Sequence, residues 1–419
     1  MPAILGGGLA AFLVIGLPVG IAIALSSMLG LYFFTDIPMA MAGQRMISGM
    51  RSFPLLAIPL FVLAGSIMNA GGITRRLIDF AHALVGQMRG GLAAVNIVTN
   101  MIFGGVSGSA VADASSVGRL LIPQMLRRNY TPGFSASVTA IGSTVALILP
   151  PSITLIIYGV TAQASIADLF FHGLFYGLGF GIVYIITAYV LARIKKLPVE
   201  SAVSRQTMIR AFRDALLALM LPVIVLGGIR IGVFTATEGG AVAVAVALFL
   251  GGVVYRELTV QSLIKALRDS AILVATIMLI IASAQIYSLA LVTGGIADQI
   301  SSIVLGVTTS TLLILLMINI LLLLVGTVVE GNAAIIIFTP ILLPIVTAVG
   351  VDPVHFGLIV VINLAIGLVT PPAGICILIT CKIAGIQLEQ SLRDLLPWLC
   401  VSIASLMAVT YVPLLLDFY

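Results

Sequence analysis

Charged side chains are scarce in this sequence. Asp, Glu, Lys and Arg make up 8% of its 419 residues, against about a quarter in ordinary soluble domains. Hydrophobic residues make up 61%, and uncharged apolar stretches long enough for a helix to cross a bilayer recur along the chain. The composition excludes a soluble protein and predicts an all-α polytopic membrane protein. The long apolar runs also exclude a β-barrel, whose strands alternate in short segments.

Cysteine pairs, metal-binding spacings and nucleotide-binding motifs are lacking as well. The three cysteines lie in apolar stretches without a CxxC pattern, so neither a redox pair nor a zinc site is predicted. The three histidines are far apart, and no Gly-rich turn ends in the Lys–Ser/Thr of a phosphate-binding loop. We therefore expect no enzyme and no cofactor. The net charge of +5 comes from basic residues in short loops, where they orient a membrane protein, so no nucleic-acid partner is expected.

The chain contains an internal duplication. Four prolines in its first half are each followed 221 positions later by a proline in the second half (344 − 123 = 221 for the first pair). The first set is Pro123, Pro132, Pro150 and Pro151, and the second is Pro344, Pro353, Pro371 and Pro372. Upstream, Gly71–Gly72–Ile73 corresponds to Gly294–Gly295–Ile296. Because self-similarity at one long period is typical of repeated structural units, we predict two homologous halves.

The basic residues indicate that the halves are inserted in opposite orientations. The segment after Gly72 carries Arg75, Arg76 and Arg89, whereas the segment after Gly295 carries no basic residue. Lys and Arg accumulate in cytoplasmic loops, so the first segment should be cytoplasmic and its counterpart external. Most other basic residues then also lie inside, with Arg45, Arg51 and Arg230 outside and Arg119 at membrane depth. Inverted repeats are typical of secondary transporters, whereas a channel would need a continuous polar pore.

Each half contains an apolar segment that must begin and end on the same side of the membrane. These segments, 91–126 and 309–347, have Gly-rich polar centres, GGVSGSA from Gly104 and GTVVEGN from Gly326. We predict re-entrant helical hairpins, because irregular backbone at membrane depth is tolerated only where it lines a protein cavity. A transmembrane helix broken by a Pro-Pro pair follows each hairpin, at about 131–161 and 353–381. Proline leaves a backbone carbonyl without its helical donor.

The two hairpin tips and the two broken helices should converge near the bilayer midplane. Freed carbonyls with Ser, Thr and Asn oxygens could coordinate Na⁺ there, and helix N-termini could face an anionic substrate. The first Na⁺ site would use Gly105, Ser107, Ser109, Gly142, Val145 and Pro150. The second would use Gly326, Thr327, Asn332, Gly367 and Thr370. The alternative is that these small residues only allow close helix packing.

Two carboxylates and one guanidinium lie at unusual depth. Asp113 and Glu330 stand where the returning helix of each hairpin should begin. They could therefore act in function or stabilise a helix N-terminus, and both readings stay open. Arg119 could pair with a carboxylate or extend to the membrane interface. The candidate substrate-binding residues are Ser107, Gly108, Asp113, Arg119, Ser143, Ser152, Glu330 and Thr370.

With these motifs in place, the sequence resembles the large membrane subunit (DctM type) of tripartite ATP-independent periplasmic (TRAP) transporters. The resemblance covers nearly the whole chain and departs from many relatives at the second hairpin tip, around Glu330. Its blocks are Phe53–Gly65 (FPLLAIPLFVLAG), Met68–Gly72 (MNAGG), Gly105–Asp113 (GVSGSAVAD), Leu149–Ser152 (LPPS), Ile157–Gly159 (IYG), Phe234–Gly240 (FTATEGG) and Gly367–Pro372 (GLVTPP).

The resemblance implies an elevator-type carrier in a bacterial inner membrane, with a scaffold and a transport domain. It implies coupling to Na⁺ and uptake of an organic acid anion, such as a C4-dicarboxylate or sialic acid. It also implies two protein partners, a small four-helix membrane subunit and a periplasmic substrate-binding protein. The small subunit would pack on helices within 16–70 and 214–292, although the small residues there could pack within this chain instead. A self-sufficient Na⁺- or H⁺-coupled carboxylate carrier is the alternative.

The expected organisation is two inverted repeats, 1–192 and 214–419, joined by a basic cytoplasmic connector at 193–213. Scaffold helices should occupy about 1–70 and 214–292. Amphipathic segments at 73–89 and 193–213 should lie along the cytoplasmic interface. About ten or eleven helices should cross the membrane. The sequence leaves open whether residues 2–34 form one broken helix or two.

Overall fold

The computed structural model describes residues 1–199 and 204–415, and the secondary structure of these residues is helical apart from one isolated bridge between Arg89 and Val199. Residues 200–203 of the predicted connector lie outside the described residues. The helices of the first half are α1 (Pro2–Val14), α2 (Val19–Phe34), α3 (Met39–Met50), the short 3₁₀ helix η1 (Phe53–Leu56), α4 (Ala57–Ala70), α5 (Ile73–Val85), α6 (Gly91–Ser107), α7 (Ala110–Arg127), α8 (Pro132–Ile148), α9 (Ile153–Ala162) and α10 (Ile166–Ile194). Those of the second half are α11 (Arg205–Arg230), α12 (Ala236–Phe249), the π-helical turn η2 (Leu250–Val254), α13 (Val260–Thr293), α14 (Ile296–Val307), α15 (Thr311–Gly326), α16 (Gly331–Ala348), α17 (Pro353–Gly367), α18 (Ile375–Ala384) and α19 (Leu388–Leu415).

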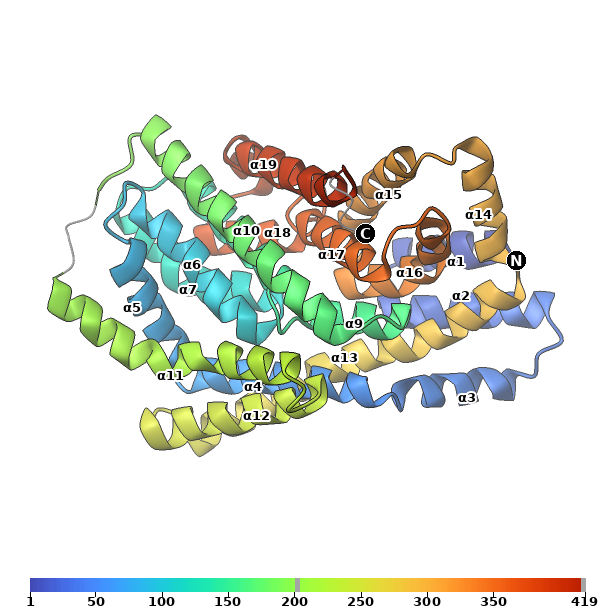
Figure 1. The fold of residues 1–419 in the computed structure, drawn as a ribbon, viewed down its shortest axis with the longest axis horizontal. Helices are drawn as coiled ribbons and strands as arrows, with labels where there is room; N and C mark the ends of the chain where they lie inside the picture. The colour runs from blue at the N-terminus through green and yellow to red at the C-terminus, as the bar shows by residue number, and fades with distance from the viewer. Residues whose placement is uncertain (200–203, 416–419) are drawn as a thin grey trace.

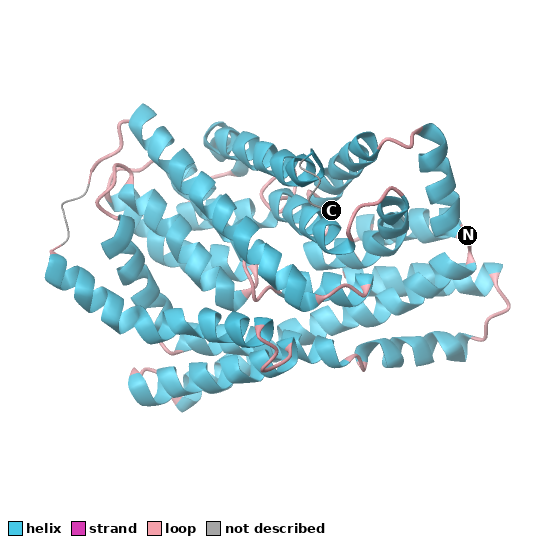
Figure 2. Ribbon diagram, viewed as in Figure 1, coloured by secondary structure: helices cyan, strands magenta, loops and turns pink. Residues whose placement is uncertain are grey.

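The helices form two groups that lie side by side. In Figure 1, α3, α4, α12 and α13 run lengthwise along one side of the molecule, and α6, α7, α10, α17, α18 and α19 lie on the other. Within the first group α12 packs on α4, and α13 packs on α2, α3 and α4. Within the second group α8 contacts α6, α7, α18 and α19. Figure 2 shows how short most of the connecting loops are.

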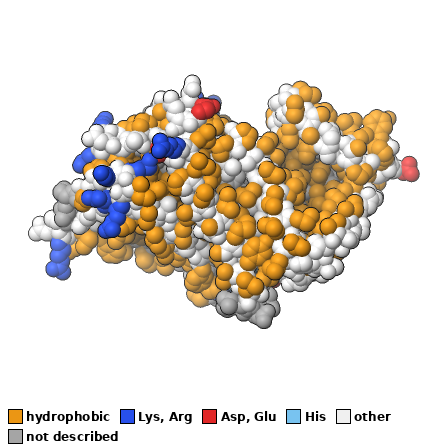
Figure 3. Space-filling view, turned by 90° about the horizontal axis from the view of Figure 1, so that it is seen from above, with side chains coloured by type: hydrophobic (Ala, Val, Ile, Leu, Met, Phe, Trp, Pro, Cys, Tyr) orange, Lys and Arg blue, Asp and Glu red, His pale blue; other side chains and the backbone are white. Residues whose placement is uncertain are grey.

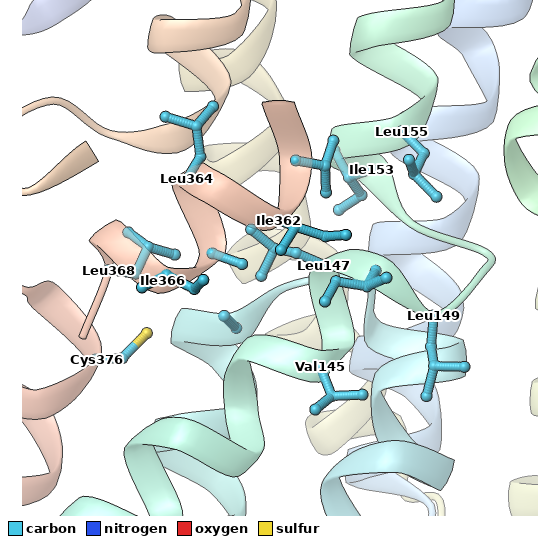
Figure 4. Packing of buried hydrophobic residues seen from close by; sticks show 14 of the residues in the cluster. Val145, Leu147, Leu149, Ile153, Leu155, Ile362, Leu364, Ile366, Leu368 and Cys376 are labelled. Atoms are coloured by element: carbon cyan, nitrogen blue, oxygen red, sulfur yellow. The ribbon is translucent and has the colours of Figure 1, made fainter. Parts of the chain in front are cut away.

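Helices α8 and α17 form the centre of the second group. Every residue of α8 from Gly133 to Ile148 and every residue of α17 from His355 to Gly367 is buried, which is typical of a helix that is apolar all round and packed inside a larger bundle. Leu147 of α8 lies beside Ile362 of α17 in this core (Figure 4). Both helices begin in the same way, with a side-chain cap followed by proline: Thr131 accepts the amide of Phe134, and Asp352 accepts that of Val354.

The residues 2–34 form two helices, which answers the question that the sequence left open. The first, α1, ends at Val14, and α2 begins at Val19 after Gly16 and Pro18. Gly16 has a φ of +89°, a conformation that an L side chain rarely adopts. Proline at position 18 lacks the amide that a continuous helix would need.

Fewer helices are long enough to cross a bilayer than the ten or eleven that we expected. Seven described helices are at least 18 residues long and sufficiently apolar, or eight if α8 and α9, which meet at a bend of 42°, count as one span. The difference arises because many apolar segments are divided. Each of α1, α2, α6, α15, α17 and α18 has 10 to 17 residues, whereas a single crossing needs about 20.

Helix pairs occupy both stretches in which hairpins were predicted. The stretch 91–126 contains α6 and α7, and the stretch 309–347 contains α15 and α16. The broken segments 131–161 and 353–381 correspond to α8 with α9 and to α17 with α18, and the peptide bonds Pro150–Pro151 and Pro371–Pro372 are both cis. The stretch 73–89 contains the amphipathic helix α5. Residues 205–213 are not a separate amphipathic helix but the first turns of α11, which continues to Arg230.

Basic side chains gather at one end of the molecule, at the left of the face shown in Figure 3. Figure 1 places α5, the C-terminus of α10 and the start of α11 at this end, which we call the basic end. Ion pairs join neighbouring elements there, from Arg76 to Glu257 at 2.7 Å and from Lys195 to Asp394 at 2.6 Å. At the opposite ends of α10 and α11, Arg230 lies 3.3 Å from Asp168.

Candidate functional site

A cavity of about 550 Å³ lies between the two helix groups, and we call it the central cavity. One wall comes from α2 and α13, and the other comes from the turns of both hairpins and from the breaks that follow α8 and α17. Its lining residues are Pro18–Gly20, Gly108–Ala112, Ser115, Leu147, Ile153, Thr154, Leu273, Thr276, Ile277, Leu279, Ile280, Glu330–Asn332, Leu368 and Ile375. The two halves of the chain therefore meet at one hollow.

The first hairpin turn fits closely against the break after α8. Helix α6 ends at Ser107, and Gly108 makes the turn with a φ of +59°. A methyl group on Gly108 would lie 3.1 Å from the carbonyl oxygen of Pro151, so only glycine satisfies both the backbone conformation and the space. Ser109 then caps α7 by accepting the amide of Ala112 at 3.4 Å. Gly108 and Ser109 line the cavity, as the N-terminus of α7 does.

Asp113 is buried beside this turn and is hydrogen-bonded to it. Its carboxylate is fully buried in the first turn of α7, and one oxygen accepts a hydrogen bond from the Ser107 hydroxyl. The second oxygen, Oδ2, has no hydrogen-bond partner among the described residues. Asp113 and Ser107 do not line the central cavity. Asp113 could have a functional role or a structural one, and its position favours the structural role. It lies inside the hairpin, one turn away from the residues that face the cavity.

Glu330 occupies a different position in the second hairpin. It is the N-cap of α16, and its side chain accepts the amide of Ala333 at 3.1 Å. Unlike Asp113, it also lines the central cavity, together with Gly331 and Asn332. The Asn332 side chain reaches across to the first half, where its Oδ1 accepts a hydrogen bond of 3.4 Å from the hydroxyl of Thr154. Glu330 therefore combines the capping position with a place on the cavity wall.

The residues of the first predicted Na⁺ site are only partly brought together. Gly105 lies against the break, since a methyl group there would be 3.4 Å from the Pro150 carbonyl oxygen. Gly142 instead faces Asn100 and Asn96 of α6, and the Val145 carbonyl accepts the amide of Leu149 inside the helix end. Ser107 and Ser109 are adjacent, with the Ser109 amide 3.4 Å from the Ser107 hydroxyl. The oxygens nearest the turn thus come from the hydroxyls of Ser107 and Ser109 and from the carbonyls of Pro150 and Pro151.

The second predicted Na⁺ site is built on a close contact between backbones. A methyl group on Gly367 would lie 2.5 Å from the carbonyl carbon of Gly326 and 2.7 Å from its oxygen. The same positions in the first half, Gly104 and Ala146, are also in contact. The hydroxyls of Thr327 and Thr370 donate to carbonyls one turn earlier, Leu324 and Ile366, each at 2.8 Å. Their lone pairs are therefore available to a cation.

The remaining candidate residues lie away from the cavity. Ser143 is buried in α8 and donates to the Ala140 carbonyl, and Ser152 caps α9, with its hydroxyl 2.6 Å from the Leu147 carbonyl oxygen. Arg119 lies on an exposed part of α7 and lines a neighbouring cavity instead. The central cavity is lined by no Lys or Arg among the described residues. An anion there would be held by the N-terminus of α7 and by hydroxyl and amide groups, because the Glu330 carboxylate already caps the N-terminus of α16.

Several residues of the cavity were not predicted from the sequence. The whole scaffold wall was missed, from Pro18–Gly20 to Leu273–Ile280, and so were Ser115 and Thr154. The break at Pro18 and the position of Thr154 just after the Pro-Pro pair are signals that could have pointed to them. The apolar residues of α13 carry no such signal, since a lipid-facing and a cavity-facing leucine look alike in a sequence. Among the described residues, no cluster of His, Cys, Asp and Glu could hold a metal ion.

A fold of long apolar helices with two helical hairpins and a central cavity defines a multi-pass membrane protein. Residues 7–415 match the family model of the DctM component of the tripartite ATP-independent periplasmic transporters. The chain belongs to this family, as its sequence motifs had led us to expect.

Curated relatives agree over almost the whole chain. It is 38% identical over 392 residues to a C4-dicarboxylate TRAP transporter large permease protein of Pseudomonas aeruginosa, covering 94% of this chain and 92% of the relative. It is 36% identical to a sialic acid TRAP transporter large permease protein of Vibrio cholerae, covering 92% of this chain and 90% of the relative. An isethionate TRAP transporter permease protein of Oleidesulfovibrio alaskensis is 39% identical over 99% of this chain, which spans 66% of that longer protein.

The fold itself has a solved counterpart. The crystal structure of the YdaH transporter of Alcanivorax borkumensis superimposes with a TM-score of 0.62, covering 89% of this chain and 88% of the other, at 12% sequence identity. At 12% sequence identity the match shows a shared fold and nothing about function.

Proposed function

We propose that this protein is the large permease subunit of a TRAP transporter that takes up an organic acid anion by Na⁺-coupled secondary transport across the bacterial inner membrane. The observation that carries the proposal is the central cavity. The N-terminus of α7 and the Glu330-capped N-terminus of α16 lie there beside hydroxyl and amide groups, and no Lys or Arg of the described residues lines the cavity. The N-terminus of α7 favours a carboxylate, and the Ser, Thr and backbone oxygens of the adjacent turns and breaks suit Na⁺.

Matched contacts in the two halves support an inverted repeat. The contact of Gly104 with Ala146 corresponds to that of Gly326 with Gly367, and the two cis Pro-Pro bonds occupy positions 221 residues apart (371 − 150 = 221). The gathering of basic side chains at one end (Figure 3) supports a cytoplasmic placement of that end. The central cavity lies between two helix groups, an arrangement suited to an elevator-type carrier whose transport domain moves against a scaffold.

The relatives guide the choice of substrates and partners. Their names specify a C4-dicarboxylate, sialic acid and isethionate, all of which are organic anions. We propose the same chemical class for this chain, together with a small membrane subunit and a periplasmic binding protein as partners. The large apolar side chains exposed on α11 and α12, for example Val223 and Phe249, offer the small subunit and the surrounding lipid a surface to cover.

Uptake into proteoliposomes tests the substrate class. Vesicles would contain this chain with the small subunit and binding protein encoded beside it, and they would be offered succinate, isethionate and N-acetylneuraminate under an inward Na⁺ gradient. We expect one of the three to accumulate above its external concentration, and glucose, which carries no charge, not to accumulate. Accumulation of glucose, or of none of the acids, would contradict the proposal.

A further inference from the structure

A second cavity, of about 540 Å³, lies next to the central cavity and has the opposite charge character. It is formed by α4, α7 and α13, and it is lined by Ser66, Asn69, Ala70, Ser115, Ser116, Arg119, Leu120, Ser262, Lys265, Ala266 and Asp269. Two cationic side chains and one anionic side chain line it, whereas Glu330 is the only charged residue lining the central cavity within the part of the chain that the structure describes. We call it the polar vestibule.

The two cavities follow one another along the same helices. On α7, Ala110–Ala112 line the central cavity, Arg119 and Leu120 line the vestibule, and Ser115 lines both. On α13, Leu273–Ile280 face the central cavity and Ser262–Asp269 face the vestibule. At 1.5 Å per residue, their centres are separated by roughly 10 to 15 Å along these helices. Because Ser115 lines both cavities, the polar vestibule lies directly next to the central cavity along α7.

The vestibule lies on the side of the basic end. Helix α13 begins three residues after Glu257, which pairs with Arg76 of α5. Moving along α13 from Ile280 through Asp269 to Ser262 therefore leads from the central cavity toward that end. An anion leaving the central cavity along this path would meet Lys265 on α13 and Arg119 on α7.

Arg119 and Lys265 are cations without a structural partner among the described residues. Neither makes an ion pair or a hydrogen bond with any residue that the structure describes. Asp269 lies one turn from Lys265 but is not within ion-pairing distance of it. Both side chains are exposed to the cavity side of their helices. Two unpaired cations from different helices on one concave surface focus a positive potential there.

We propose that the polar vestibule is a second, transient binding station for the transported organic anion, in which Arg119 and Lys265 attract a carboxylate released from the central cavity. Ser66, Ser116 and Asn69 offer hydrogen-bonding groups to it, and Asp269 limits the net attraction, so that the anion is released again. The proposal rests on the proposed function, and it assigns a role to Arg119, a predicted substrate-binding residue that does not line the central cavity.

Labelling of an engineered cysteine tests the electrostatic part without any transport. The background carries Cys400→Ser, because Cys376 and Cys381 are buried and Cys400 is exposed. Ala70→Cys then places a thiol on the vestibule wall, to be modified by an anionic (sulfonatoethyl) or a cationic (trimethylammonioethyl) methanethiosulfonate. We expect the ratio of the anionic to the cationic rate to fall on the order of tenfold in Arg119→Gln/Lys265→Gln, to stay in Lys265→Arg, and to rise in Asp269→Asn. The matched control is Val307→Cys at the end of α14, where the ratio should not change.

Uptake measurements test the binding station itself. In the tripartite vesicles, Arg119→Gln and Lys265→Gln should each lower the maximal uptake rate several-fold and leave the Na⁺ concentration for half-maximal uptake unchanged, while Lys265→Arg should retain the rate. The proposal is overturned if the labelling ratio is the same with and without the two cations. It is also overturned if the Arg119→Gln/Lys265→Gln variant takes up the acid at the normal rate. If the native protein takes up none of the acids, the proposed function has failed, and the labelling ratio alone still decides whether the vestibule concentrates anions.

Discussion

Replacing external Na⁺ by choline at constant pH should reduce uptake by about tenfold or more, to the level of vesicles without protein. The physical reason is that the proposed Na⁺ and substrate sites share the same hairpin turns, so each ligand would stabilise the geometry that the other needs. Coupling free energies of about 1–3 kcal/mol, typical of such linked sites, correspond to about 5- to 150-fold in affinity. Initial rates of uptake of the accumulated acid at graded Na⁺ concentrations provide the measurement.

Two substitutions test the two proposed Na⁺ sites separately. Ser107→Ala removes a hydroxyl from the first turn, and Thr370→Val removes one from the break after α17. Each should raise the Na⁺ concentration for half-maximal uptake several-fold, because one neutral hydrogen-bonding or coordinating group contributes about 1 kcal/mol. Ser302→Ala on α14 is the matched control, since its hydroxyl only donates to the Gln299 carbonyl of its own helix. Undiminished uptake in choline would rule out Na⁺ as the coupling ion.

Gly367→Val should strongly damage the second half, because the added side chain meets backbone atoms. Even a methyl group at this position would lie 2.5 Å from the carbonyl carbon of Gly326. Helices α15 and α17 must therefore move apart, or the valine side chain must adopt an unfavourable conformation. Overpacking of this kind costs about 1–3 kcal/mol. We expect a melting temperature lowered by several degrees in detergent and uptake lowered by at least about tenfold, because displacing a site by 1 Å can cost about a hundredfold in activity.

The control for this substitution is Gly306→Ala on α14, where nothing lies within 4 Å of the added methyl group. It should leave both the melting temperature and the uptake unchanged. Gly104→Ala in the first half should behave like a milder Gly367 variant, since its methyl group would meet Ala146 at 2.6 Å. A Gly367→Val protein with native stability and native Na⁺ dependence would mean that the contact of the two backbones is not what holds the second site.

The parts of the site that the sequence predicted are those where the chain departs from a regular helix. Gly108 is required by its left-handed backbone conformation and Pro150 marks the break after α8, and both signals are visible in the residues themselves. Gly367 was predicted too, but it is required by the contact of α17 with Gly326 of α15. Glu330 was predicted as a possible helix cap, and it caps α16 because a helix start needs an acceptor. Ser109 was predicted as a Na⁺ ligand, and its role as the cap of α7 was not foreseen.

The parts that the sequence did not predict depend on how helices are rotated and packed. Gly142 was assigned to the first Na⁺ site by its distance along the chain, but the rotation of α8 turns it toward Asn96 and Asn100. The Val145 carbonyl was expected to be free, yet the last turn of α8 uses it. The contact of Thr154 with Asn332 joins the two halves, and no feature within either half indicates it. Apart from Thr276 the scaffold wall is apolar, so only tertiary packing distinguishes its cavity face.

The most direct test of the central claim compares the complete system with this chain alone. Purified protein would be reconstituted with an inward Na⁺ gradient in four preparations: alone, with the small membrane subunit, with the periplasmic binding protein, and with both. Uptake of the acid that the binding protein binds is then measured at equal amounts of this chain. A tripartite large permease predicts accumulation only in the preparation that contains both partners. Equal accumulation by this chain alone would contradict the account and identify a self-sufficient carboxylate carrier.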